Sequence, residues 1–201
     1  MATFIMSDLM DEDQYWDIVQ QSKNNAVDQK SQVDNLVALL TKLSADEIWK
    51  FRLRTEQLLH QAHTSNLWCA VTIMNRGFVS DDSFIYFKTW LISCGKDVYN
   101  AAVADPDSLI NQIDSSIQYY EFESFRYGTH YAIEKVTGKQ IVEFQFPKNF
   151  PYSEGQYPEV SFSWCTDNPA DMKTVCPKLY NKMNPAKDTL SPPSKSRKPR
   201  R

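Results

Sequence analysis

Hydrophobic residues recur at helical spacing along most of the chain. Between residues 28 and 43, the positions i, i+3, i+4 and i+7 hold Val33, Leu36, Val37 and Leu40. Apolar residues at that spacing form one face of an amphipathic helix. Similar stripes predict helices at 11–23, 28–43, 44–62, 84–94, 96–104, 121–137 and 171–183. Asp105-Pro106 restarts the helix after residue 104, with proline in its first turn, and the buried face continues to Ile113.

Several of these helices carry recognisable ends. Ser44 and Glu47 form a capping-box pattern, in which each side chain bonds the backbone of the other residue. Gly95 and Gly138 stand where two stripes stop, as C-terminal glycines do. The helix that begins after Ser44 either continues to Gly77 or bends near residues 63–66, and we favour the bend.

The pattern changes after Gly138. Residues 141–146 and 159–164 alternate partly between apolar and polar side chains, which favours two short strands. We therefore predict a mainly α single domain over residues 8–183, with six or seven helices and a minor β element. Residues 184–201, rich in Pro, Lys and Arg, are expected to form a disordered tail.

Composition and charge narrow the class of protein. Hydrophobic residues make up 42% of the 201, and only five glycines occur, which suits a helical domain with a substantial core. The net charge is −3, but the tail is basic, so the rest of the chain carries −8. Any nucleic-acid contact should therefore be weak and run through the tail. The basic residues of the tail are Lys195, Arg197, Lys198, Arg200 and Arg201.

The cysteines and the N-terminal residues bear on the compartment. Cys69, Cys94, Cys165 and Cys176 lack metal-site spacing, and no secretory leader accompanies them. No apolar run reaches the ~18 residues of a membrane span. We expect a cytoplasmic protein without a membrane association.

The central part of the chain resembles a family. The residues that carry the resemblance are Ser80-Asp81-Asp82-Ser83-Phe84, Tyr86-Phe87, Trp90-Leu91-Ile92-Ser93 and Gly95, followed by Asp105-Pro106-Asp107-Ser108-Leu109. They are similar to the domain of unknown function 4240 family, found mostly in bacteria. The resemblance spans about residues 10–183 and implies a helical fold without an agreed activity.

Ser80, Asp81 and Asp82 form the acidic cluster with the clearest structural setting. One interpretation makes the carboxylates metal ligands or a general acid–base pair. The other makes Ser80 or Asp81 the cap of the following helix, with the acids at its positive end. We favour the capping role, because caps are common at such positions.

Neighbouring aromatic and basic residues extend this candidate surface. Tyr86 and Trp90 lie one turn apart on a helix and could line a groove, although core packing explains most aromatic residues here. Arg76 and Arg126 are candidate partners for an anion or a carboxylate.

Glu56, His60 and His63 are weak candidates for a metal site. The two histidines are three residues apart on a predicted helix, but no established ligand motif is present. Surface histidines are the simpler interpretation. Glycine-rich phosphate loops and serine nucleophile motifs are also missing from the sequence, so we expect no cofactor.

The sequence favours a non-catalytic interaction or regulatory module whose partner is another protein. The first alternative is an enzyme that uses Asp81 or Asp82 with a histidine or arginine from another helix. The second is binding of nucleic acid or an acidic partner through the tail.

Overall fold

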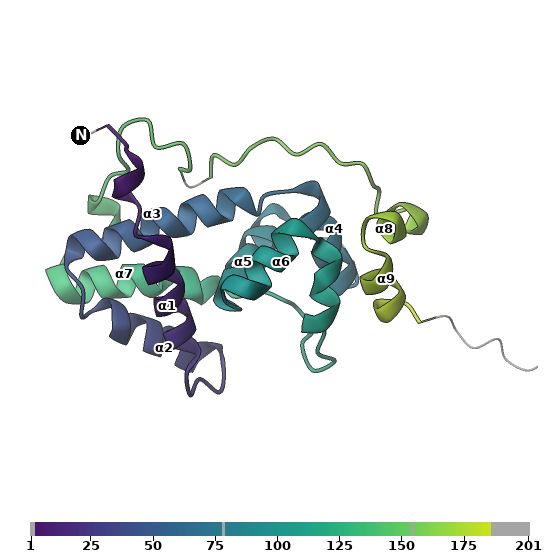
Figure 1. Ribbon diagram of the computed structural model, residues 1–201, viewed down its shortest axis with the longest axis horizontal. Helices are drawn as coiled ribbons and strands as arrows, with labels where there is room; N and C mark the ends of the chain where they lie inside the picture. Colours follow the sequence, from purple (N-terminus) through teal and green to yellow (C-terminus); the bar gives the residue numbers. More distant parts are fainter. Residues whose placement is uncertain (1–2, 78, 154, 186–201) are drawn as a thin grey trace, which may run out of the picture.

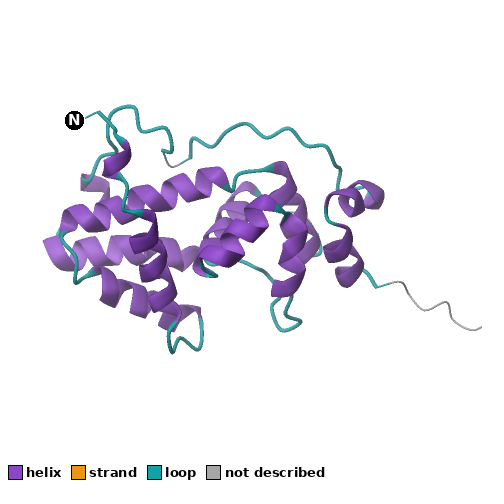
Figure 2. Ribbon diagram, viewed as in Figure 1, coloured by secondary structure: helices purple, strands orange, loops and turns teal. Residues whose placement is uncertain are grey.

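The computed structural model describes residues 3–77, 79–153 and 155–185. These residues form helices joined by loops, without a strand (Figure 2). The predicted mainly α class is therefore confirmed. The α-helices are α1 (Glu12–Lys23), α2 (Gln29–Leu40), α3 (Ala45–Gln61), α4 (Ser65–Met74), α5 (Asp81–Ser93), α6 (Lys96–Ala104), α7 (Glu123–Thr137), α8 (Pro169–Val175) and α9 (Pro177–Met183), and the 3-10 helices are η1 (Met6–Asp8), η2 (Pro106–Gln112) and η3 (Ile141–Glu143).

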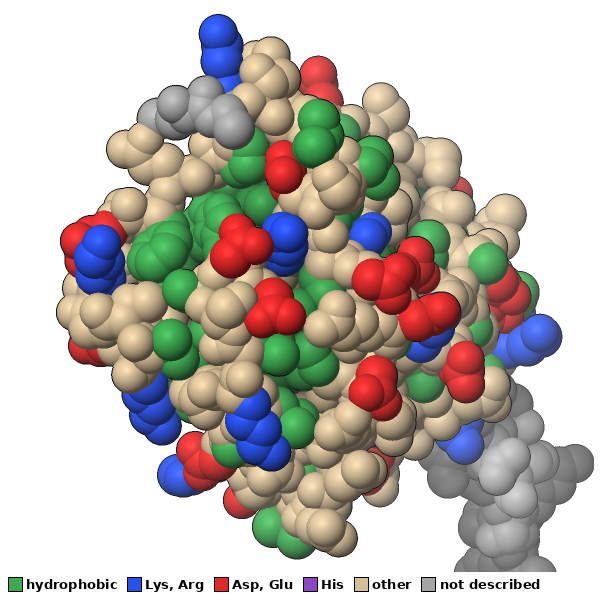
Figure 3. Space-filling model, turned by 60° about the vertical axis from the view of Figure 1, so that its left-hand side comes forward, with side chains coloured by type: hydrophobic (Ala, Val, Ile, Leu, Met, Phe, Trp, Pro, Cys, Tyr) green, Lys and Arg blue, Asp and Glu red, His purple; other side chains and the backbone are tan. Residues whose placement is uncertain are grey.

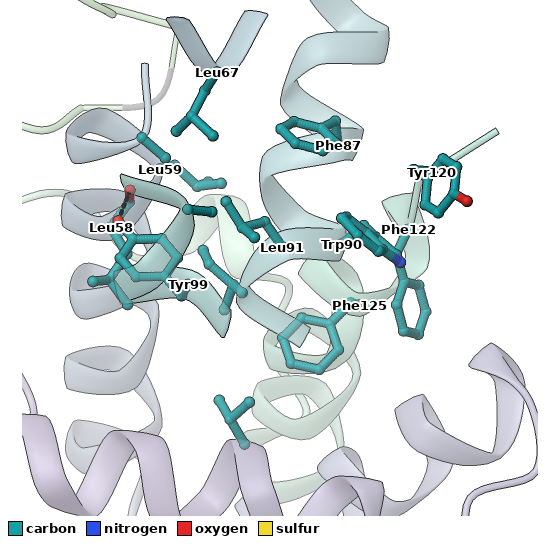
Figure 4. Close-up of a cluster of buried hydrophobic side chains, with 14 of the residues drawn as sticks. Leu58, Leu59, Leu67, Phe87, Trp90, Leu91, Tyr99, Tyr120, Phe122 and Phe125 are labelled. Carbon is teal, nitrogen blue, oxygen red and sulfur yellow. Dashed lines mark hydrogen bonds between the residues drawn. The ribbon is translucent and has the colours of Figure 1, made fainter. Parts of the chain in front are cut away.

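Helix α7 lies at the centre of the bundle. It packs against α2, α3 and α5, while α1 covers α2 and α3 (Figure 1). Apolar side chains from all these helices form one large buried cluster, part of which is drawn in Figure 4. At Gly128, an added Cβ would lie 2.7 Å from Leu36 Cδ2, so α2 and α7 approach closely because this residue has no side chain.

The predicted boundaries are mostly correct. Ser44 N donates to Glu47 Oε2 at 2.9 Å, and Glu47 N donates to Ser44 Oγ at 3.3 Å, which confirms the capping box. The chain breaks between α3 and α4, and Thr64 caps the new helix by accepting from Leu67 N at 3.3 Å. The bend near residues 63–66 is thus confirmed, and it places His63 in a turn.

The predicted β element is wrong. Within the described residues, the only β-type pairing is an isolated bridge between Thr3 and Lys148. In the first expected strand, residues 141–143 form η3, and Phe144 and Phe146 pack on Trp49 at ring distances of 5.6 and 5.5 Å. The alternation arises because one side of an irregular segment covers a helix, without a partner strand.

The predicted helix count is also wrong, because long stripes divide into shorter helices. Residues 171–183 belong to two helices, α8 and α9, which meet at Pro177. Proline lacks a backbone N–H and disfavours a helical conformation in the residue before it, and Cys176 has φ −133° and ψ 73°. The restart predicted at Asp105-Pro106 is confirmed, since α6 ends at Ala104 and the tighter helix η2 begins at Pro106.

The last two helices are fixed to the bundle through a buried carboxylate. Asp107 is 4% exposed, and its two oxygens accept from Lys178 N at 3.0 Å and Leu179 N at 2.7 Å. This residue therefore caps the N-terminus of α9. Cys176 is fully buried beside Cys69 of α4, and the two thiols interact.

No helix in the described ranges is long and apolar enough to cross a bilayer. The second alternative, binding of nucleic acid or an acidic partner through the tail, lies outside the described residues, as do Lys195, Arg197, Lys198, Arg200 and Arg201. On the face shown in Figure 3, acidic and basic side chains are interspersed with apolar patches.

Candidate functional site

Charged side chains meet in the interior where α3, α5 and α7 pack together. Glu56 of α3 is fully buried, and its Oε1 forms an ion pair with Arg52 Nη1 at 2.7 Å and accepts from Arg126 Nη2 at 3.3 Å. Buried charges are expensive unless they are paired. This arrangement of ions links α3 to α7.

Lys88 of α5 is the least expected member of this interior. Its side chain is fully buried, although lysine is among the residues that proteins bury least. The Nζ lies 2.9 Å from His63 Nδ1. Among the described residues, no carboxylate lies within ion-pair distance of this amine. Burial lowers the pKa of Lys88 to about 7; Arg126 also lowers it, and Glu56 acts in the opposite direction.

Both histidines of this region, His60 and His63, are uncharged at neutral pH. Burial and the nearby Lys88 lower the pKa of His63 to about 4. Burial also lowers the pKa of His60, whose Nε2 lies 3.1 Å from the Ser153 carbonyl oxygen. Because the imidazole of His63 is neutral, its Nδ1 accepts a hydrogen bond from the Lys88 ammonium. The single ring proton of His63 is then on Nε2.

Tyr157 covers this pair from outside the bundle. Its ring centroid lies 3.6 Å from Lys88 Nζ, and its plane is stacked on His63 at 4.7 Å and 8°. The residue belongs to the segment 155–164, here called the strap, which follows an irregular path toward α8 (Figure 1). A cation over an aromatic face is attracted by the ring quadrupole, which offsets part of the cost of burying the amine.

A groove of about 400 Å³ opens beside this cover. Three aromatic side chains line it, together with two carboxylates, Asp81 and Glu159, and the imidazole of His63. Trp68 and Phe162 meet at 5.4 Å, edge to face. Six of the residues that form the groove are His63, Trp68, Asp81, Ile85, Tyr157 and Phe162.

The predicted acidic cluster divides into a cap and two exposed carboxylates. Ser80 Oγ accepts from Ser83 N at 3.2 Å, so the serine is the cap of α5. Neither Asp81 nor Asp82 forms a hydrogen bond or ion pair within the described residues, and both side chains are exposed. Asp81 lies in the groove together with His63, a histidine from another part of the chain.

The other predicted residues lie apart from the groove. Trp90 is 8% exposed, stacks on Phe87 and meets Tyr120 edge to face in the core (Figure 4). Tyr86 is partly exposed, and its side chain interacts with Glu123, which raises the pKa of the phenol. Arg126 pairs with Glu56. Arg76 lines a different pocket, at the end of α4 beside α8 and α9.

The weak metal candidates face different partners. Glu56 binds the two arginines, His60 lies against Ser153, and His63 lies against Lys88. In the described part of the chain, no three His, Cys, Asp or Glu side chains gather as ligands for a metal ion.

The residues that sequence reasoning missed are Lys88 and Tyr157. Lys88 stands four residues after Phe84 and three before Leu91, both on the buried stripe of α5. A lysine within an apolar stripe was therefore an available signal. Tyr157 carried no signal, because its position depends on how an irregular segment crosses the bundle.

Comparison with known proteins gives a family and no activity. No curated protein matches the chain. No solved structure matches it either. A family model described as "Protein of unknown function (DUF4240)" matches residues 10–145, about two thirds of the sequence. The chain therefore belongs to the DUF4240 family.

Proposed function

We propose that this protein binds a small ring-bearing ligand in the groove beside Tyr157, and acts on it by acid–base chemistry. The contact between Lys88 Nζ and His63 Nδ1, 2.9 Å long, carries the proposal, because His63 lines the groove and Lys88 lies directly behind it. A buried amine without a carboxylate partner opposes folding, and such costs are typical of functional sites.

Each group has a role that follows from its environment. About half of the Lys88 side chains are protonated near pH 7. In the proposed reaction Lys88 donates a proton to Nδ1 of His63, and His63 donates its Nε2 proton to the ligand. Asp81 supplies a carboxylate in the same groove, and Trp68, Tyr157 and Phe162 supply faces for a flat ring. This is the enzyme alternative of the sequence analysis, with Lys88 added to it.

The test uses indole and benzoate as neutral and anionic ring probes. We expect both to shift the NMR signals of His63 and Trp68 in the intact protein. Benzoate should bind more tightly at pH 6 than at pH 8, because Lys88 then carries more charge, and K88M should remove this dependence. The proposal is refuted if the probes bind without shifting the signals of His63 and Trp68. It is also refuted if the affinity for benzoate still depends on pH in K88M.

A non-catalytic interaction module, our second candidate, would use the outer rim of the same groove. Phe162 is 49% exposed there, and the carboxylates of Asp81 and Glu159 line the same groove. An apolar ring beside acidic groups suits a basic peptide of a partner protein. In that case F162A would weaken partner binding, and K88M would leave it unchanged.

A further inference from the structure

The environment of the Lys88 amine points to a specific chemistry for the ligand of this groove. The side chain is fully buried, and the described residues place an imidazole, not a carboxylate, at its end. An amine in this setting is uncharged in a large share of molecules at neutral pH. An uncharged lysine is a nucleophile as well as a base, and carbonyl compounds are its usual substrates.

The space above the amine already holds a flat ring. Tyr157 lies over Nζ at 3.6 Å and is parallel to His63, to within 8°. A conjugated ring of similar size would therefore fit over the imidazole and the amine when Tyr157 withdraws. The groove of about 400 Å³ adjoins this position and provides the approach.

Few backbone hydrogen bonds hold the strap that carries Tyr157. From Pro158 to Ser163, no backbone hydrogen bond joins the segment to the described residues. It is anchored farther on, where Trp164 Nε1 donates to Ser65 O and Oγ at 2.9 Å. Segments with few hydrogen bonds open at low free energy, so withdrawal of one ring leaves the bundle intact.

We propose that Lys88 captures an aromatic or conjugated aldehyde as an imine, with the aldehyde ring in the position now held by Tyr157. The inference rests on the proposed function, since it uses the same groove. The amine lone pair forms the C–N bond while the carbonyl π electrons move to oxygen. His63 takes a proton from nitrogen and returns it to that oxygen, which gives a carbinolamine. His63 then donates a proton to the hydroxyl, and the nitrogen lone pair forms the C=N bond as the C–O bond breaks and water leaves. The proton that remains on nitrogen returns to His63, so no net proton is consumed.

The experiment uses salicylaldehyde and sodium borohydride on the intact protein at pH 7. Borohydride adds hydride to the imine carbon and leaves a stable secondary amine, which peptide mass mapping locates. Lys30 is an internal control, because its side chain is 82% exposed and Asp34 raises its pKa. We expect Lys88 to be labelled at least about tenfold faster than Lys30, since only the former is appreciably deprotonated.

Variants separate this inference from the proposed function. Y157A should accelerate labelling of Lys88, and H63Q should slow it, because the proton carrier is lost. Labelling confined to exposed lysines in both the wild type and Y157A would overturn the imine. If indole and benzoate still bind in the groove in that case, the acid–base proposal stands alone; if they do not, both proposals fail.

Discussion

At the scale of the residue, one buried amine determines how stability should depend on pH. Lys88 has a folded-state pKa of about 7, below its ordinary value of 10.5. Between these values the unfolded state binds more protons than the folded state, so stability rises with pH across that window. The rise approaches about 1.4 kcal/mol per pH unit where only the unfolded state is protonated.

K88M should remove that rise. We expect the variant to exceed the wild type in unfolding free energy at pH 7, and the difference to narrow toward pH 9. Urea denaturation at several pH values measures it. K30M is the matched control, because Lys30 is exposed and its pKa, raised by Asp34, lies above the window. Parallel wild-type and K88M curves would show that Lys88 keeps an ordinary pKa.

A second prediction at this scale concerns the cap of α5. Ser80 provides the capping hydrogen bond, and Asp81 and Asp82 do not. S80A should therefore cost about 1 kcal/mol. D81N and D82N should each cost less, because they remove only an exposed charge near the helix dipole. Thermal unfolding distinguishes them, and a larger loss for D81N than for S80A would contradict the assignment.

At the scale of the element, the close contact of α2 and α7 depends on Gly128. G128A places a methyl group 2.7 Å from Leu36 Cδ2. Overpacking costs roughly 1–3 kcal/mol, and alanine returns up to about 1 kcal/mol of helix propensity. We expect a net loss of about 1 kcal/mol in a denaturant titration. G77A is the control, since nothing lies within 4 Å of its added Cβ.

The attachment of α9 can be tested through Asp107. D107A leaves the Lys178 and Leu179 amides without their acceptor, and we expect a loss of about 1.5–3 kcal/mol. The exposed Asp97, in the first turn of α6, is the charge-matched control, and D97A should cost less than about 1 kcal/mol. Equal effects would mean that Asp107 contributes only its charge.

The helices were predictable because each carries its own evidence. The spacing of Val33, Leu36 and Val37 predicts α2, and the capping box of Ser44 and Glu47 predicts the start of α3. The failures lie where local pattern and long-range packing disagree. The alternation at 141–146 imitates a strand because Trp49, distant in sequence, covers one side of it.

The candidate site was only partly predictable for the same reason. The sequence indicated Ser80, Asp81 and His63 as possible functional residues, yet it could not place His63 and Asp81 in one groove. The turn after α3 and the start of α5 come together only in the folded bundle. Trp90 had the right spacing for a groove residue, but its side chain points into the core.

At the scale of the whole molecule, the reactivity of the cysteine thiols shows whether the C-terminal helices are docked on the bundle. Cys165 is exposed, Cys69 and Cys176 are fully buried, and burial raises the pKa of the half-buried Cys94 to about 12. A thiol reagent should therefore modify one site quickly in the native protein, and all four in denaturant. C165S should remove the fast phase; a second fast site at Cys176 would show that α9 does not stay docked.

The hydrogen bonds of Asp107 limit how far this chain can be shortened. The family match ends at residue 145, but Asp107, inside it, finds its hydrogen-bond donors more than thirty residues past that limit. A fragment that ends at residue 145 would also lack Cys176, which lies beside Cys69, and Tyr157, which covers Lys88. Recombinant work should therefore extend through Met183, since a shorter piece would lack parts of its own interior.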